Sequence, residues 1–301
     1  MVSINTRILA AEYEYLAPAI LDEVLNILAE KQRVKVLAGG TDLIVKLKTG
    51  ADIAMDYMLD IKRVAGLDYV RFDENEAMLH IGPTATLSRI EKDPIVKEKY
   101  PALVEAIALM AAVSVRNMGT MAGNICNASP VADSVIPAIC YQAAVTLSSK
   151  GASRTVPLHE FFLAPGVSVM KPDELLTDIA IPLPKAGAGA AFVKKTRVRP
   201  DIAKISIGAL IELEGDTVTA CRIAMAAIAA TPAYLQAVGE SMVGKQMSEE
   251  LIAETAALAA ASIKPIDDNR TTAEYRLHIA EVMTADVLRE AWKRAGREEN
   301  V

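Results

Sequence analysis

The stretch from Val115 to Asp133 constrains this chain more than any other. It reads VRNMGTMAGNICNASPVAD and holds two glycines, three asparagines and a proline among nineteen residues. Such residues tolerate left-handed backbone or let another group approach closely, so they suit a loop around a phosphorylated ligand better than a core. An ordinary surface loop between helices is the alternative, because glycine and asparagine are also common turn residues.

A second glycine stretch, Val34 to Lys48, favours the ligand interpretation. A β-branched run ends in Gly39-Gly40 and leads into an amphipathic segment. We expect a strand, a tight turn and a helix start, which directs free backbone N–H groups and a helix dipole toward a pyrophosphate. The turn has neither GxGxxG spacing nor the GK[ST] ending of a P-loop. Asp42 is unfavourable beside phosphate, so we expect it to turn inward and cap backbone N–H groups.

Together, AGGTDL and RNMGTMAGNICNASPVAD resemble the FAD-binding subunit of molybdenum-containing hydroxylases, the family of xanthine, carbon monoxide and nicotinate dehydrogenases. The segments Phe161 to Pro184 and Lys194 to Leu213 resemble later parts of that family, so the likeness spans nearly the whole chain. The resemblance implies an α+β fold. A two-lobed FAD-binding domain of the vanillyl-alcohol-oxidase/PCMH type would cover residues 1–184, with lobes of about 1–57 and 58–184. A C-terminal domain with an antiparallel sheet and helices would cover 185–301.

The central stretch matches the family's GTIGGN pattern from Gly119 to Asn124, with Ala122 where glycine is common. Thr120 and Asn124 can bond phosphate and ribityl oxygens. The carboxylate of Asp133 can accept hydrogen bonds from ribityl or ribose hydroxyls. It could instead, or in addition, cap a helix over residues 134–143. For Arg116 we expect a salt bridge or bonds to carbonyls, with phosphate contact as the alternative.

Further contacts are implied by the resemblance alone. Val169 and Ile179 would contact FAD through their backbones, and Leu163 to Gly166 would form a mobile cover, or else a plain loop packed on the core. A cation near the flavin N1–C2=O region favours the reduced flavin. Lys204 is preferred for this role and Lys195 is second, with a solvated lysine as the alternative. The predicted FAD contacts are Leu37, Ala38, Gly39, Gly40, Thr41, Asp42, Leu43, Ala111, Gly119, Thr120, Ala122, Gly123, Asn124, Asp133, Val169, Ile179, Lys195 and Lys204.

Length and charge narrow the class of protein. At 301 residues and 52% apolar composition, the chain can form two domains with sizeable cores. A net charge of −6 argues against a nucleic-acid binder. No apolar run approaches the roughly 18 residues of a membrane span, and we find no signal peptide. We expect a soluble, cytoplasmic protein.

Cysteine and histidine usage points to a noncovalent cofactor. The three cysteines are too few and too scattered for a disulfide framework or an iron–sulfur cluster, although Cys126 could approach a cofactor. The lack of a cysteine-rich insertion disfavours the hydroxybenzoyl-CoA reductase branch. His80 has the setting of a structural histidine. No histidine lies in a flavin-attachment motif, so we predict noncovalent FAD, and we expect no metal site and no catalytic acid–base constellation.

Hydrophobic periodicity predicts the elements of both domains. Strands are expected over 34–37 and 57–61, in hairpins over 69–81, 143–157 and 205–227, and as a strand edge over 174–182. Helices are expected over 20–28, 86–91, 101–113, 134–143, 233–243, 248–263 and 273–295, with a linker over 182–189.

The resemblance implies a function in electron transfer. A large partner subunit would hydroxylate the substrate at a molybdenum cofactor, and two [2Fe–2S] clusters in a small subunit would deliver electrons to this FAD and on to NAD+ or another acceptor. One alternative is a self-sufficient flavoenzyme of the same fold, which would need a substrate-binding acid, base or anchor that we do not find. A cofactor-free assembly subunit is disfavoured by the intact glycines. The interpretation requires the two glycine corners to converge.

Overall fold

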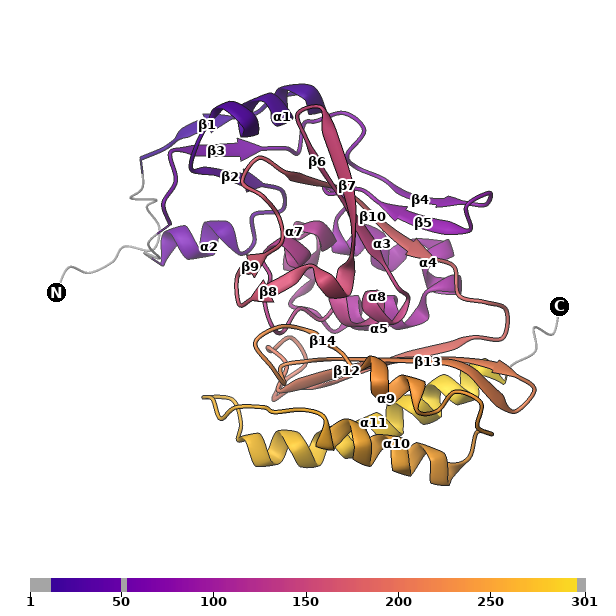
Figure 1. Cartoon of the computed structure of the whole chain (residues 1–301). Helices are drawn as coiled ribbons and strands as arrows, with labels where there is room; N and C mark the ends of the chain where they lie inside the picture. The colour runs from indigo at the N-terminus through magenta and orange to yellow at the C-terminus, as the bar shows by residue number, and fades with distance from the viewer. Residues whose placement is uncertain (1–11, 50–52, 297–301) are drawn as a thin grey trace.

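The chain is described over residues 12–49 and 53–296 of a computed structural model. Figure 1 shows a small indigo lobe at the top, a larger magenta lobe in the middle, and a sheet backed by orange and yellow helices at the bottom. None of the described helices is both long and apolar enough to cross a membrane. Mostly antiparallel sheets with separate helices confirm the expected α+β class.

The small lobe is a parallel sheet in the order β1–β3–β2. Its elements are β1 (Glu14–Leu16), α1 (Leu21–Glu30), β2 (Val34–Leu37), α2 (Leu43–Lys48) and β3 (Tyr57–Asp60). Helix α1 forms because Val24, Leu25 and Leu28 recur on one face, where all three are buried. Since β3 pairs with both other strands, the small lobe runs through Asp60, past the boundary expected near residue 57.

The larger lobe contains an antiparallel sheet in the order β4–β5–β10–β6–β7. Its strands are β4 (Val70–Asp73), β5 (Met78–Ile81), β6 (Ala144–Ser149), β7 (Ala152–Pro157) and β10 (Leu175–Pro182). Strand β10 is central, not the edge that we expected, because Leu176, Ile179 and Ile181 are all buried in the core. A short hairpin, β8 (Phe162–Ala164) and β9 (Val167–Ser168), follows the 3-10 turn η1 (Leu158–Glu160). Both hairpins predicted for this lobe are confirmed.

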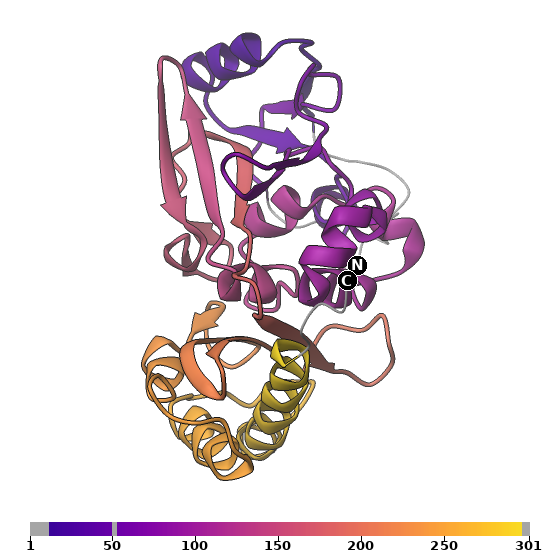
Figure 2. The ribbon, with the colours of Figure 1, turned by 90° about the vertical axis from the view of Figure 1, so that its right-hand side faces the viewer.

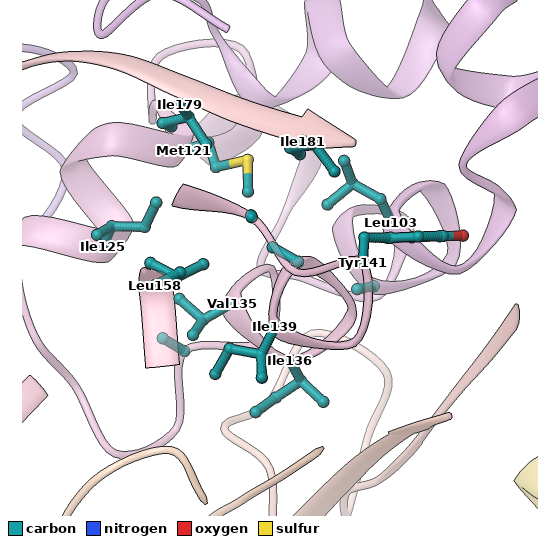
Figure 3. Packing of buried hydrophobic residues seen from close by; sticks show 14 of the residues in the cluster. Leu103, Met121, Ile125, Val135, Ile136, Ile139, Tyr141, Leu158, Ile179 and Ile181 are labelled. Carbon is teal, nitrogen blue, oxygen red and sulfur yellow. The ribbon is translucent and has the colours of Figure 1, made fainter. Parts of the chain in front are cut away.

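Six short helices connect β5 to β6. They are α3 (Leu87–Lys92), α4 (Pro94–Lys99), α5 (Pro101–Ala108), α6 (Val113–Arg116), α7 (Met121–Cys126) and α8 (Val135–Cys140). Part of the glycine-rich stretch is therefore helical, and the expectation of a loop outside the core is wrong for helix α7. Met121 and Ile125, four residues apart on α7, are fully buried beside Val135 (Figure 3). The Thr120 hydroxyl starts α7 by accepting a hydrogen bond from the Gly123 N–H at 2.9 Å.

The C-terminal sheet is antiparallel in the order β11–β12–β13–β14. Its elements are β11 (Gly189–Lys195), β12 (Ile205–Glu214), β13 (Thr217–Ala226), β14 (Ala233–Tyr234), α9 (Gln236–Glu240), α10 (Glu249–Ala261) and α11 (Ala273–Ala295). The long hairpin of β12 and β13 was predicted, whereas β11 was not. The helix expected over 233–243 begins only at Gln236, because Ala233 and Tyr234 pair with β13.

This sheet lies between two sets of helices (Figure 2). Helix α11 packs on β11 and β12, and α8 of the larger lobe packs on β12 and β13. Both contacts are close. A Cβ added at Gly189 would lie 2.0 Å from the Ala291 carbonyl oxygen, and one added at Gly208 would lie 3.1 Å from Ile136. The larger lobe and the C-terminal sheet therefore share a packed interface.

Polar contacts cross the same interface. Glu105 of α5 accepts a hydrogen bond from the Phe192 N–H at 3.0 Å and forms an ion pair with Arg294 of α11 at 2.5 Å. Arg294 also donates to the Ala190 carbonyl at 2.7 Å. The end of α5 is thereby held against β11, and the next residues of that chain segment border the cavity described below.

Candidate cofactor site

The two glycine corners meet. A Cβ added at Gly39 would lie 2.2 Å from the Met118 carbonyl oxygen and 2.8 Å from the Gly119 Cα. A Cβ at Gly119 would lie 3.3 Å from the Thr41 hydroxyl. Gly40 has a φ of +72°, which glycine adopts without strain. The convergence required by the sequence argument is confirmed, although the corners are eighty residues apart in the chain.

A cavity of about 620 Å³ opens beside the corners, within the usual range for ligand pockets. We call it the central cavity. Most of the residues predicted from the sequence lie on its wall. They are Ala38, Gly39, Gly40, Thr41, Asp42, Leu43, Ala111, Gly119, Thr120, Ala122, Gly123, Asn124 and Asp133. Leu37 instead borders a neighbouring groove on which Gly39, Gly40 and Thr120 also lie.

Besides Leu37, four predicted contacts are not on the wall of the central cavity. Ile179 is fully buried in β10 and pairs with strands on both sides. The Val169 N–H and carbonyl are bonded to Phe161 and to Arg154. The Lys195 side chain is exposed on β11, and the Lys204 ammonium lies 5.3 Å from the centroid of the Tyr275 ring.

A different lysine, Lys194, lies on the cavity wall. Its ammonium is 2.7 Å from Asp133 Oδ2, and the two side chains are 3% and 7% exposed. Strand alternation explains why Lys194 and not Lys195 lies on the cavity wall, because residues 194 and 195 point to opposite faces of β11. Sequence reasoning missed Lys194 because it did not predict β11. The short run GAAFVKK with its β-branched and aromatic residues was the available signal.

The other Asp133 oxygen, Oδ1, is buried and has no hydrogen-bond partner among the residues that the structure describes. Burial raises the pKa of the Asp133 carboxyl, and the nearby Lys194 ammonium opposes that rise. The alternative role of Asp133 as a helix cap is not observed, since α8 begins after Ser134 without a side-chain cap bond. The buried Ser206 hydroxyl lies near this carboxyl and also lowers its pKa, so Ser206 and a ligand hydroxyl are both candidate donors to Asp133.

The sequence also predicted contacts for two other polar residues near the corners, Asp42 and Arg116. Asp42 is exposed and makes no cap hydrogen bond with α2, so the expected inward cap is wrong. Arg116 donates to Glu91 at 3.0 Å and to the Met110 and Ala111 carbonyls at 2.9 and 3.1 Å. The salt-bridge and carbonyl-binding interpretation of Arg116 is therefore confirmed.

The rim of the cavity holds two further side-chain contacts. The Lys46 ammonium donates to the Asn127 side chain at 2.7 Å and joins the small lobe to the larger one. Cys126 lies on the wall with its sulfur 3.6 Å from that of Met170. Over residues 12–49 and 53–296 no group of three His, Cys, Asp or Glu residues could hold a metal ion. Away from the cavity, His80 bonds Asp178 at 2.8 Å, the structural role expected for it.

Comparison with known proteins agrees with this architecture. A family model described as the FAD binding domain in molybdopterin dehydrogenase matches residues 11–184. A second, the CO dehydrogenase flavoprotein C-terminal domain, matches residues 190–291. Fold and cavity thus define a flavin-binding oxidoreductase subunit. More narrowly, this chain belongs to the family of FAD-binding medium subunits of molybdenum-containing hydroxylases.

Several relatives match along their whole length. The chain is 31% identical over 284 residues to the putative xanthine dehydrogenase FAD-binding subunit of Escherichia coli strain K12, covering 94% of this chain and 97% of that protein. A solved carbon monoxide dehydrogenase from Hydrogenophaga pseudoflava is 30% identical with a TM-score of 0.90, covering 94% of this chain and 98% of that one. Quinoline 2-oxidoreductase from Pseudomonas putida 86 has a TM-score of 0.88 at 26% identity, covering 95% and 99%.

Proposed function

We propose that this chain holds FAD noncovalently in the central cavity and passes electrons from the iron–sulfur clusters of a small partner subunit to NAD+ or another acceptor. A large partner subunit would carry the molybdenum cofactor and the substrate site. The convergence of the glycine corners carries the proposal, because it builds a backbone cradle for a diphosphate. The names of relatives support it, among them the carbon monoxide dehydrogenase medium chain of Hydrogenophaga pseudoflava, 30% identical over 283 residues.

The cradle suits a diphosphate for steric reasons. Gly39 and Gly119 have no Cβ, so the two backbones can meet at this wall. The Gly119 N–H already donates to the Val115 carbonyl at 2.7 Å and the Gly123 N–H to Thr120, so the N–H groups of the Gly39–Gly40 turn are the donors that we propose for the phosphates. The Asn124 amide oxygen accepts from the Ser134 hydroxyl at 2.9 Å, which leaves the Asn124 NH₂ group available as a donor. Asp42 also lies on this wall, so the proposal requires its carboxylate to face away from the phosphates.

The Asp133–Lys194 pair suits the remaining part of the cofactor. The Asp133 carboxylate lies on the cavity wall and can accept a hydrogen bond from a ribityl or ribose hydroxyl. Lys194 is the cation that we now propose for the flavin, in place of Lys204 and Lys195. The chemistry that bound FAD would supply is the uptake and release of one or two electrons. The protein supplies the cradle, the hydroxyl acceptor and the fixed positive charge.

An absorption spectrum of the purified chain titrated with FAD tests cofactor binding. We expect a saturable flavin spectrum, and release of all flavin on denaturation, because none of the three histidines of the chain, all within the described residues, lies on the wall of the central cavity. A chain that stays colourless at every FAD concentration would overturn the proposal.

Co-expression with the two candidate partners tests the assembly. We expect a three-component complex containing molybdenum and iron. Substrate turnover by the isolated chain would instead support a self-sufficient flavoenzyme. Bleaching of the flavin spectrum by NADH under anaerobic conditions would support NAD+ as the acceptor, and an unchanged spectrum would point to another acceptor.

A further inference from the structure

Three successive carbonyls follow helix α5 at the wall of the central cavity. The last carbonyls of a helix lack partners within the helix and need others. Lys194 donates to the Leu109 carbonyl at 3.2 Å. Arg116 donates through Nη1 to the Met110 carbonyl at 2.9 Å and to the Ala111 carbonyl at 3.1 Å. Two buried cations therefore bond the carbonyls of this turn.

The turn is strained where it meets the cavity. Ala111 has a φ of +43°, in the left-handed region that alanine disfavours. Met110 and Ala111 both lie on the cavity wall. Such a conformation persists only when its surroundings enforce it. The hydrogen bonds to the carbonyls of this turn are the enforcing contacts.

Arg116 is well placed to enforce the turn without touching a ligand. It is 9% exposed and is absent from the residues that line the cavity. Its Nε is anchored by Glu91 of α3 at 3.0 Å, so the guanidinium is both paired and fixed in direction. A planar guanidinium can bond a carboxylate and two carbonyls at once, whereas a lysine ammonium in the same place lacks this fixed geometry.

We propose that Arg116 is a positioning residue, which holds the left-handed turn at Ala111 in the conformation that completes the cavity wall and thereby raises affinity for FAD. This inference rests on the proposed function, because it takes FAD as the ligand of the central cavity. It assigns to a residue outside the cavity a specific effect on cofactor binding, transmitted through two backbone carbonyls.

The test is a fluorescence titration with FAD of the full chain, together with thermal unfolding without FAD. We expect R116Q to weaken FAD binding by about 10- to 100-fold and R116K to recover only part of the loss. E91Q keeps Arg116 but removes the charge that anchors it, so we expect a smaller loss of FAD affinity. This variant replaces R116Q in the test if R116Q does not fold. R89Q is the matched control. Arg89 pairs with Asp68 at the surface, where its side chain is 45% exposed.

A second substitution separates positioning from a general loss of stability. In the R116Q background, A111G should recover several-fold of the lost affinity, because glycine adopts a positive φ without enforcement. A merely structural role for Arg116 predicts a lower unfolding temperature, unchanged FAD affinity and no recovery. That result would overturn the inference while leaving the proposed function intact. Failure of the unaltered chain to bind FAD would overturn the proposed function and this inference together.

Discussion

The central cavity has two unlike walls. One is built from backbone, where Gly39 meets Met118 and Gly119 with no room for a Cβ. The other is built from charged side chains, where Lys194 and Asp133, 61 residues apart in the chain, form a buried ion pair. The backbone wall determines the shape of the cavity and the charged wall its electrostatics. Local motifs therefore suffice to predict the shape of the cavity, whereas the position of the charged side chains on its wall depends on how the two domains pack.

Removing one partner of the ion pair should have the largest effect. In K194M the Asp133 carboxylate stays buried without its cation, so we expect the free energy of unfolding to fall by about 3–5 kcal/mol. Denaturant unfolding measures it. The double variant D133N/K194M removes both charges and should be much less destabilised. Equal losses in the single and double variants would show that the charged wall contributes packing alone.

The loss in K194M should also depend on pH. Burial raises the pKa of the Asp133 carboxyl and Lys194 opposes the rise, so K194M should raise this pKa further. A carboxyl with a folded-state pKa above its unfolded value stabilises the fold at low pH, and this stability is lost as the pH rises from the unfolded pKa to the folded one. The deficit of K194M relative to the unaltered chain should therefore grow once the pH rises above the folded-state pKa of Asp133 in the unaltered chain. A deficit independent of pH would contradict this account.

The backbone wall is tested by G39A, with the next largest effect. The added Cβ would overlap the Met118 carbonyl, so we expect a loss of about 1–3 kcal/mol in the free energy of unfolding and at least tenfold weaker FAD binding. G296A is the control. Its Cβ would lie 3.8 Å from the nearest atom, an ordinary contact. Unchanged FAD affinity in G39A would show that the glycine corners do not bind the diphosphate.

Ala122 tests how closely the backbone wall must approach the ligand. A122G restores the glycine of the family pattern but weakens helix α7, so we expect a loss of about 0.5–1 kcal/mol in stability and a change in FAD affinity of less than about threefold. A256G in α10, also buried but far from the cavity, should show the same stability loss. A large gain in FAD affinity in A122G would mean that its Cβ restricts the cradle.

The smallest effects are expected for the two lysines first favoured from the sequence. K204M loses the contact with the Tyr275 ring, a change of about 0.5–1 kcal/mol in stability. K195M alters an exposed side chain, and we expect less than about 0.5 kcal/mol. Neither should change FAD affinity, in contrast to K194M. A loss of FAD affinity in K195M or K204M would show that the substituted lysine contributes to FAD binding.

Sequence reasoning succeeded where the signal was local. The strand before Gly39, helix α1 and the long hairpin of β12 and β13 follow from hydrophobic periodicity over a few residues. It failed where distant packing decided the outcome. Helix α5, expected to reach residue 113, ends at Ala108, because later contacts from Lys194 and Arg116 hold a left-handed turn. Helix α7 lies in the core because Met121 and Ile125 find apolar partners there.

By itself the sequence determined the two glycine corners, because missing Cβ atoms and turn preferences are properties of single residues and their neighbours. The motifs around these corners also carried the resemblance to the family. Only the tertiary structure decided which lysine faces the cavity and which carboxylate it pairs with. Lys194 and Lys195 are identical in chemistry, and the pleat of one strand against its partner turns the first inward and the second toward solvent.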